Sequence, residues 1–395
     1  MIQRHLQTRL LEAASKYPVA AVTGPRQSGK TTLCQYALPD YTYVNLEKPD
    51  IRRYAAEDPN DFLRIYRNYV IFDEVQRVPE LFSYLMPMVD EDPRAGRFIL
   101  TGSQNFLLME SVSQSLAGRV AILHLMPFAL RELLERAPLD VQTFSIAEME
   151  GVKEAPDVWE HLFTGGFPPI HDRGHEPGDW MAQYTQTYLE RDVRSLINVG
   201  DLESFERFLR LCAGRTAQTL NYAALASDTG VSVPTAKRWL SVLKASFLVR
   251  VLPPHHRNFR KRLTKSPKMH FTDSGLLCYL LGIRSAEELA FHSCRGAIFE
   301  SYVVSAISKA FLHRGIEPPL FYWRDSTGRE VDLIVEQGEK PIPFEIKSGA
   351  TFNPDMIQDI AWWCGLAGSE AGALVYAGDD EQYRRGIRVL PWHAV

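Results

Sequence analysis

One eight-residue segment constrains this chain more than any other: residues 24–31 read Gly-Pro-Arg-Gln-Ser-Gly-Lys-Thr. The segment matches the pattern of a phosphate-binding loop (P-loop) and directly follows the apolar run Val19–Val22, as such a loop requires. Its glycines let backbone N–H groups curl around phosphate, and the helix that opens at Thr31 adds its positive N-terminal dipole. The pattern therefore predicts ATP binding. The predicted ATP-binding residues are Gly24, Pro25, Arg26, Gln27, Ser28, Gly29, Lys30, Thr31 and Thr32.

An apolar run that ends in two carboxylates supplies the second half of the predicted site. Tyr69–Phe72 is followed by Asp73 and Glu74, and open α/β sheets bind ligands at the edge where strands end. We expect Lys30 to reach the β- and γ-phosphates. The Thr31 hydroxyl would bind Mg2+, and Asp73 would hold the same ion through water. Glu74 would polarise the attacking water, whereas the alternative is a solvated acidic loop after a strand.

Two further polar positions are candidates for chemistry at the γ-phosphate. Arg97–Leu100 leads into Thr101-Gly102-Ser103, where we expect Ser103, with Thr101 as second choice, to sense the γ-phosphate; a plain turn is the alternative. Arg119 is predicted to be an arginine finger that acts on the ATP of a neighbouring subunit, because arginine stabilises transition-state charge bidentately. The alternative is a surface arginine at the start of a strand. The predicted catalytic residues are Glu74, Ser103 and Arg119.

The pattern around these motifs predicts a parallel sheet covered by helices. Short apolar runs alternate with helical stretches through the first third of the chain, and runs that are nearly all apolar indicate strands buried on both faces. From Pro127 to about Asn198 the pattern is mostly helical, which predicts a lid or connector. The predicted strands are Val19–Val22, Tyr41–Leu46, Tyr69–Phe72, Arg97–Leu100 and Val120–Leu125.

Composition indicates the cellular compartment of the protein more than its activity. The net charge of −4 gives no whole-chain attraction for nucleic acid, so a nucleic-acid site would have to be a local patch. Five scattered cysteines without a CxxC pair argue against a zinc site or a disulfide framework and favour a reducing cytoplasm. No run of eighteen apolar residues occurs, so we expect no membrane span.

The middle segment has the spacing of a helix-turn-helix. Apolar spacing marks a helix over residues 220–226, a turn containing Gly230 follows, and Val233–Leu243 reads as a second helix with Pro234 at an early position. In the DNA-binding use of this plan the second helix faces a groove. Such modules also serve as protein adapters beside ATPase cores, and the sequence leaves both uses open. The predicted DNA contacts on this helix are Thr235, Lys237 and Arg238.

A basic stretch follows the helix-turn-helix. Residues 250–268 contain seven lysines or arginines and no acid, which is the composition expected for contacts to a phosphate backbone. The alternative is a solvated loop. The predicted DNA contacts in this stretch are Arg257, Arg260, Lys261, Arg262 and Lys265.

The last segment resembles the core of PD-(D/E)xK nucleases. Asp332 lies in one predicted strand, and Glu345 and Lys347 lie in the next, so that both carboxylates could share a second divalent metal, Mg2+ or Mn2+. Lys347 would face the same side as Glu345 and orient or help deprotonate water, and Glu300 would complete the metal shell from a helix. Val331 stands where the pattern usually has proline. The alternative is a hairpin with exposed charges and a Glu–Lys pair.

The chain as a whole resembles prokaryotic ATPases of the AAA superfamily whose C-terminal half is a domain of unknown function. The resemblance rests on residues 24–31, 71–76, 100–103, 116–119 and 271–276. It implies an α/β fold with a P-loop AAA-type parallel-sheet core, a helical lid, a winged-helix module and a restriction-endonuclease-like α/β end. The expected domains are 1–130 for the core, 131–200 for the lid, 201–272 for the winged helix and 273–395 for the nuclease-like domain.

These patterns predict a cytoplasmic, Mg2+-dependent ATPase that acts on DNA as a homo-oligomer, for which a ring is one of the arrangements that stay open. One alternative is an ATP-regulated switch that binds a protein partner and has no activity on DNA. DNA-stimulated ATP turnover would separate it from the first prediction. The other alternative is an ATP-dependent metal nuclease, whose DNA cleavage would disappear in Asp332→Ala.

Overall fold

The chain forms two compact units. The computed structural model describes residues 2–103, 118–144, 153–188, 202–255, 266–336, 341–369 and 371–395. The first unit comprises residues 1–128 with two short later segments, 245–247 and 311–317. The second unit comprises residues 129–244, 248–310 and 318–395.

The first unit is built on a five-stranded parallel sheet in the order β2-β3-β4-β1-β5. Each strand begins and ends within two residues of the range predicted from the sequence. The predicted α/β parallel-sheet core is therefore confirmed. The strands are β1 (Val19–Thr23), β2 (Thr42–Asn45), β3 (Val70–Asp73), β4 (Phe98–Gly102) and β5 (Val120–His124).

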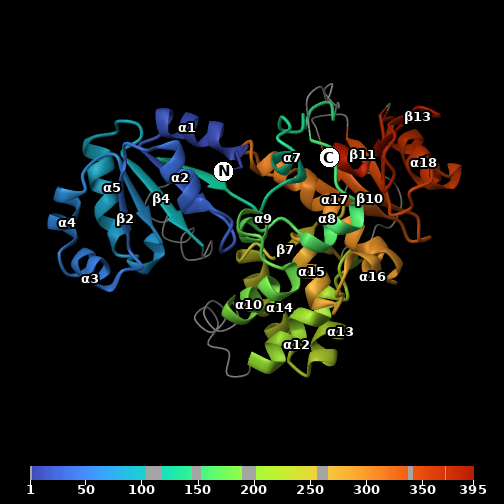
Figure 1. Cartoon of the computed structure of the whole chain (residues 1–395), viewed down its shortest axis with the longest axis horizontal. Coiled ribbons are helices and arrows are strands. Elements are labelled where there is room, and N and C mark those ends of the chain that lie inside the picture. The colour runs from blue at the N-terminus through green and yellow to red at the C-terminus, as the bar shows by residue number, and fades with distance from the viewer. Residues whose placement is uncertain are drawn as a thin grey trace. The chain divides into compact units, whose positions relative to one another are not determined.

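Helices cover both faces of this sheet (Figure 1). Side chains alternate along β1, so Ala20 packs with α1 and α2 on one face, and Ala21 packs with α4 and α5 on the other. The expectation of burial on both faces holds for β1, β3 and β4, whereas β2 and β5 are partly exposed because they are the edge strands. The helices are α1 (Leu6–Lys16), α2 (Lys30–Ala37), α3 (Pro49–Glu57), α4 (Pro59–Ile65), α5 (Leu81–Glu91) and the 3-10 helix η1 (Val75–Arg77).

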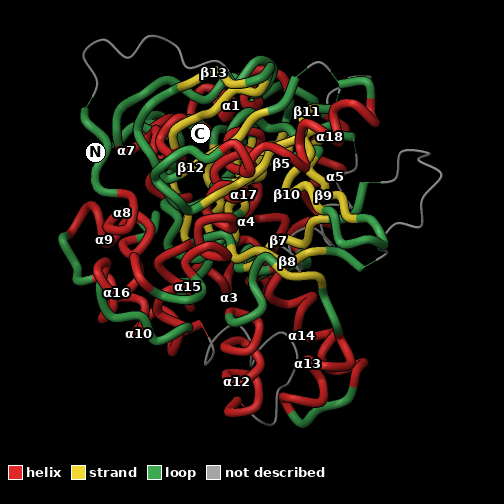
Figure 2. Tube along the Cα trace, turned by 90° about the vertical axis from the view of Figure 1, so that its right-hand side faces the viewer, coloured by secondary structure: helices red, strands yellow, loops and turns green. Residues whose placement is uncertain are grey.

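The second unit begins with helices and a small antiparallel sheet of order β6-β8-β7. Helices α12, α13 and α14 form a group in Figure 2, where Trp239 of α14 packs edge-on against Phe205 and Phe208 of α12. The elements are α7 (Leu130–Leu133), α8 (Val158–Thr164), α9 (Pro168–Arg173), α10 (Pro177–Tyr188), α12 (Leu202–Ala213), β6 (Gln218–Thr219), α13 (Tyr222–Thr229), α14 (Val233–Ala245), β7 (Val249–Leu252) and β8 (Lys268–Phe271).

A six-stranded mixed sheet completes the second unit, in the order β13-β14-β12-β11-β10-β9. Strands β9, β10 and β11 pair antiparallel, and β11, β12 and β14 pair parallel. The elements are α15 (Ser274–Leu280), α16 (Ala286–Phe291), α17 (Arg295–Leu312), β9 (Leu320–Arg324), β10 (Glu330–Val335), β11 (Ile342–Lys347), η3 (Pro354–Ile357), α18 (Gln358–Ala367), β12 (Ala373–Tyr376), β13 (Gln382–Arg384), β14 (Ile387–Pro391) and η4 (Trp392–Ala394).

The motif at residues 271–276 has a structural role in the second unit. Asp273 is buried, and its carboxylate accepts hydrogen bonds from the backbone N–H of Leu276, at the start of α15, and of Gly166. A Cβ on Gly165 would lie 2.5 Å from Asp273 Oδ1, so this close approach requires glycine. The motif thus fastens α15 to the glycine turn after α8.

None of the helices in the described ranges is both long and apolar enough to cross a membrane.

Candidate functional site

The P-loop adopts a backbone that only glycine permits at its first position. Gly24 has φ +150°, and a Cβ there would lie 2.1 Å from the carbonyl oxygen of Leu125, just after β5. Gly29 caps α2 with φ 91°. These two glycines bring the loop to the end of the sheet and turn it into the helix. The local fold is therefore that of a phosphate-binding loop, as the sequence predicted.

Lys30 and Ser28 supply polar groups inside the loop. Lys30 is buried, and its Nζ donates to the carbonyl oxygens of Gly24 at 3.0 Å and of Pro25 at 2.8 Å. Ser28 Oγ is also buried and has no hydrogen-bond partner among the described residues. A buried hydroxyl without a partner is costly unless a ligand engages it. The loop therefore fits a phosphate group.

Of the other predicted loop residues, Pro25 is buried, Arg26 is half-buried, and Gln27 and Thr32 are exposed.

Asp73, at the end of β3, is held by three hydroxyl groups. Thr31 Oγ1 donates to Asp73 Oδ1 at 3.0 Å, which joins the two predicted Mg2+ ligands. Tyr43 Oη donates to Asp73 Oδ2 at 2.7 Å, and Thr101 Oγ1 donates to Oδ1. All three donors are neutral, so the negative charge of the carboxylate remains available for a cation. The structure thus brings Thr31 and Asp73, the two predicted Mg2+ ligands, into hydrogen-bond contact.

Glu74 lies next to this group in an uncommon backbone conformation. Its φ of 56° and ψ of 43° place it in the left-handed region, which costs about 1 kcal/mol or more for a residue other than glycine. Its Oε2 accepts hydrogen bonds from Ser103 Oγ at 3.2 Å and from Gln76 Nε2. The predicted sensor Ser103 therefore contacts the predicted base, and the strained backbone aims Glu74 together with Asp73 at the same sheet edge.

Arg119 does not reach the P-loop of its own chain. It directly precedes β5, which runs parallel to β1, whereas the P-loop follows the other end of β1. Five strand residues separate the two sheet edges by about 16 Å at a rise of about 3.3 Å per residue. The guanidinium donates to the Asp90 carboxylate, with Nη2 at 3.0 Å from Oδ2. Arg119 thus lies at the sheet edge opposite the P-loop of its own chain, in an ion pair with Asp90.

Three contacts at the nucleotide site were not predicted as primary site residues. Arg4 is buried, and its guanidinium donates to the carbonyl oxygen of Ser28 at 2.7 Å and of Met126 at 2.6 Å, so it fixes the P-loop backbone. Tyr43 and Thr101 lie on the two strands that flank β3. Thr101 was predicted only as a second choice for the sensor. No local sequence pattern marks Arg4 or Tyr43, because a backbone contact between distant residues places Arg4 and strand order places Tyr43 beside Asp73.

The predicted DNA contacts on α14 differ in exposure. Lys237 and Arg238 are exposed, whereas Thr235 is half-buried and lies one turn before the buried Trp239. The Nζ of Lys237 lies 5.4 Å from the ring centroid of Tyr222 in α13. In the basic stretch the predicted contacts lie outside the described residues; they are Arg257, Arg260, Lys261, Arg262 and Lys265.

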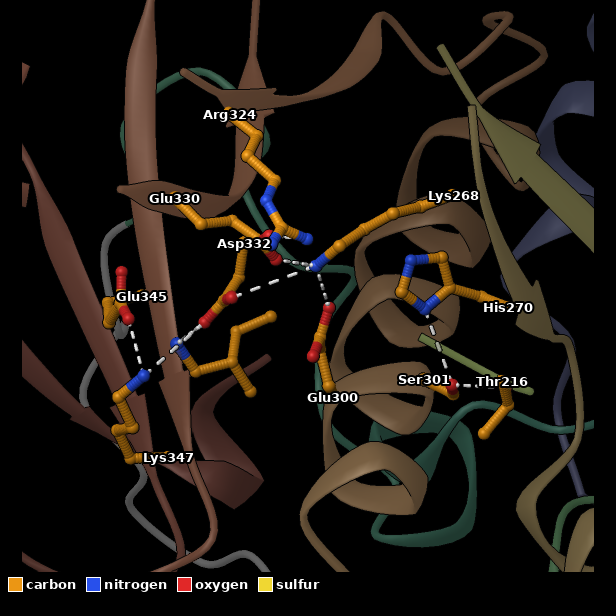
Figure 3. A network of polar contacts seen from close by, with 11 residues as sticks. Thr216, Lys268, His270, Glu300, Ser301, Arg324, Glu330, Asp332, Glu345 and Lys347 are labelled. Atoms are coloured by element: carbon orange, nitrogen blue, oxygen red, sulfur yellow. Dashed lines mark hydrogen bonds and ion pairs between the residues drawn. The ribbon is translucent and has the colours of Figure 1, made fainter. Parts of the chain in front are cut away.

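A second polar cluster lies between β10, β11 and α17 (Figure 3). Asp332 and Glu345 lie on adjacent antiparallel strands, as predicted. Lys347 Nζ contacts Glu345 Oε1 and lies 3.8 Å from Asp332 Oδ2, which confirms that Lys347 and Glu345 face the same side. Asp332 Oδ2 also accepts a hydrogen bond from the N–H of Ile346 at 2.9 Å. An ammonium group therefore already bridges the two predicted metal ligands.

Lys268 is a central member of this cluster, although it was predicted as part of the basic stretch 250–268. Its Nζ lies 2.9 Å from Glu300 Oε1 and 3.9 Å from Asp332 Oδ1, and it also contacts Glu330. Its inclusion in a basic surface stretch was wrong, because Lys268 is buried at the start of β8. Glu300, predicted as a metal ligand, pairs with this lysine instead.

Burial dominates the electrostatics of the second cluster. It raises the pKa of Glu300 to about 8, and the neighbouring Asp332 charge adds to this effect. Burial, followed by the charge of Asp332, also raises the pKa of Glu345 well above its usual value. For Lys268 burial acts to lower the pKa, but the charges of Glu300, Asp332 and Glu330 outweigh it and keep the pKa above its ordinary value. The lysine therefore stays charged.

Family comparisons match three successive parts of the chain. An AAA domain matches residues 16–134. Two domains of unknown function follow, one (DUF8612) over residues 155–287 and one (DUF4143) over residues 295–395. The AAA match covers the P-loop, Asp73, Glu74 and Ser103, whereas Arg4 precedes it.

Individual relatives extend the similarity over most of the chain. The uncharacterized proteins Rv2008c of Mycobacterium tuberculosis and Mb2031c of Mycobacterium bovis are each 32% identical over 354 residues, covering 88% of this chain and 74% of theirs. An uncharacterized protein of Haemophilus influenzae is 21% identical over 297 residues, covering 68% of this chain and 70% of its own. Among solved structures, the Walker-type ATPase PABY2304 of Pyrococcus abyssi matches 71% of this chain and 96% of its own with 15% identity and a TM-score of 0.44.

Proposed function

The chain belongs to the family of the mycobacterial proteins Rv2008c and Mb2031c and is an AAA-superfamily protein, and we propose that it hydrolyses ATP with magnesium and acts on DNA. One observation carries the first half of this proposal. Two segments that are distant in the sequence meet at the sheet edge where the P-loop lies. The segment after β1 supplies Lys30 and Thr31, and the end of β3 supplies Asp73 and Glu74.

Each of these side chains has a distinct task in hydrolysis. Lys30 would exchange the Gly24 and Pro25 carbonyl oxygens for the β- and γ-phosphate oxygens of ATP. Thr31 and Asp73 would hold Mg2+, which would neutralise charge developing on the phosphates. The hydroxyls of Tyr43 and Thr101 fix the Asp73 carboxylate in the orientation for this role.

Glu74 is the group we propose to polarise the attacking water. Its Oε2 is fixed by Ser103 and Gln76, so Oε1 remains to accept a hydrogen bond from water. Ser103 would thereby report the state of the γ-phosphate to the base. Nucleophile activation and phosphate binding are therefore divided between two strands, and the two tasks should be separable by mutation.

The test compares nucleotide binding and turnover in two variants. Lys30→Ala should weaken ATP binding at least about tenfold, because one cation on the phosphates is lost. Glu74→Gln should bind ATP as wild type does and lose at least about 100-fold in turnover. Lys48→Ala and Glu57→Gln, at exposed positions of the same unit, are the matched controls. Wild-type turnover in Glu74→Gln would remove Glu74 from its proposed role.

Action on DNA is the second half of the proposal, and α13, α14 and the β7–β8 pair support it. Two helices are joined by a short turn at Gly230 and followed by an antiparallel strand pair, and this order supports the proposal of a helix-turn-helix with a wing. The exposed Lys237 and Arg238 on α14 would contact a DNA backbone. An adapter for a protein partner is the competing use, and ATP turnover that does not respond to DNA would favour it.

We propose a nuclease-like fold, serving to bind DNA, for the C-terminal sheet. Asp332 and Glu345 on adjacent strands, with Lys347 beside Glu345, support the fold. Cleavage is not part of the proposal, because Lys268 and Lys347 both lie within ion-pair distance of Asp332.

Arg119 supports assembly into a homo-oligomer. Since it lies at the sheet edge opposite its own P-loop, it would act on the ATP of a neighbouring subunit. Mixing Arg119→Ala with Glu74→Gln subunits should then restore part of the turnover that each has lost. Arg94→Ala, which removes an exposed arginine paired with Asp92, is the control. Full activity in a strictly monomeric preparation would eliminate action in trans.

A further inference from the structure

The cluster around Asp332 combines four carboxylates with three cationic side chains. Lys268 lies within ion-pair distance of Glu300, Glu330 and Asp332. Lys347 pairs with Asp332 and Glu345, and Arg324 Nη1 lies 3.4 Å from Glu330 Oε2. Figure 3 shows the Lys268 ammonium pointing between α17 and β10, toward carboxylates from both elements. A cation bound by carboxylates from two elements is the arrangement of a metal site, with an ammonium group in the cation position.

One atom of the cluster points to a ligand beyond the lysines. Glu345 Oε2 is buried and accepts no hydrogen bond from any described residue, although Oε1 of the same carboxylate contacts Lys347. A buried carboxylate oxygen without a donor is costly, and it can still bind a cation. The two lysines therefore leave one carboxylate oxygen of the cluster, Glu345 Oε2, without a hydrogen-bond donor among the described residues.

We propose that this cluster is a latent divalent-cation site that Lys268 closes. The ammonium of Lys268 takes the cation position, and Mn2+ or Mg2+ binds to Asp332 and its neighbouring carboxylates only when Lys268 is withdrawn. The site does not depend on ATP hydrolysis at the P-loop.

Lys268 rather than Lys347 is the closing group because of where each side chain is anchored. Lys347 is on the same strand as Glu345, and its side chain is 39% exposed, so it can swing into solvent. The Lys268 side chain is 2% exposed and comes from β8, which belongs to the other sheet of this unit. It can leave only if β8 moves away from α17.

A second contact two residues further along β8 fixes the same strand against α17. His270 Nδ1 lies 3.3 Å from Ser301 Oγ, and Ser301 Oγ lies 2.7 Å from Thr216 Oγ1, which precedes β6 (Figure 3). Lys268 and His270 face the same side because side chains alternate along a strand. Displacement of β8 from α17 would therefore open the site.

The test measures Mn2+ binding to the full-length chain without nucleotide, by electron paramagnetic resonance of the free ion. Wild type and Asp332→Asn should bind Mn2+ equally. Lys268→Met should gain one ion per chain with an affinity at least about tenfold higher than that of wild type. Adding Asp332→Asn to Lys268→Met should abolish the gain. Lys268→Arg, which retains a cation, should behave like wild type.

Two results would overturn the proposal. One is Mn2+ binding to the wild-type chain that is absent from the Asp332→Asn variant, because the site would then be open already. The other is a folded Lys268→Met chain, checked by circular dichroism, that gains no ion. Should Lys268→Met fail to fold, Lys268→Gln removes the same charge and keeps a polar side chain. The comparison of wild type with Asp332→Asn still shows whether the wild-type site is already open to Mn2+.

Discussion

Asp73 and Asp332 are both strand aspartates with similar burial, 6% and 8% exposed, yet their partners differ in charge. Asp73 is held by the neutral hydroxyls of Thr31, Tyr43 and Thr101. Asp332 lies within 4 Å of the ammonium groups of both Lys268 and Lys347. Hydroxyl donors orient a carboxylate and leave its charge for a metal, whereas ammonium groups cancel that charge. We infer that the charge of its partners, more than its burial, decides whether such an aspartate can bind a metal ion.

The largest expected effect concerns stability, and it comes from the closed cluster. Lys268→Met leaves buried carboxylates without their main cation, so the free energy of unfolding of the second unit should fall by about 3–5 kcal/mol at neutral pH. Urea unfolding followed by tryptophan fluorescence measures this change. Lys244→Met, which alters an exposed lysine of α14, should change stability by less than about 0.5 kcal/mol. Equal stability of the two variants would show that Lys268 does not hold the cluster together.

An intermediate effect is expected from cations that are exposed instead of buried. Lys237 and Arg238 are positively charged like Lys268, but their side chains are exposed, so they can reach a DNA backbone. Replacing both by alanine should weaken duplex binding regardless of sequence and reduce the slope of log affinity against log salt by about two. Fluorescence anisotropy at several salt concentrations measures this slope, with Lys244→Ala as the control on the same helix. An unchanged slope would return α14 to a role as a protein adapter.

The smallest effect is expected from a neutral donor at the open site. Tyr43→Phe removes one hydroxyl from Asp73 and leaves the two threonine donors in place. The free energy of unfolding of the first unit should fall by about 0.5–1.5 kcal/mol. Chemical denaturation compared with Tyr36→Phe, an exposed tyrosine on α2, measures it. A loss as large as that of Lys268→Met would erase the distinction between neutral and charged partners.

The sequence predicted the parts of the molecule that local patterns encode. The P-loop, Asp73 with Glu74, and all five strands of the first sheet follow from motifs and apolar runs. Tyr43 and Arg4 carry no such pattern, because their roles depend on strand order and on a backbone contact between residues 24 positions apart. Lys268 was misplaced for a related reason. Its basic neighbours indicate a surface stretch, whereas the sheet β6-β8-β7 buries its side chain against α17.

The most direct test of the contrast between the two sites is the number of metal ions bound per chain. We would titrate the wild-type chain with Mn2+ in the presence of a nonhydrolysable ATP analogue and measure the free ion by electron paramagnetic resonance. We expect one bound ion per chain, lost in Asp73→Asn and retained in Asp332→Asn. Two ions per chain, one of which disappears in Asp332→Asn, would contradict it, because the second cluster would then be as open to a cation as the first.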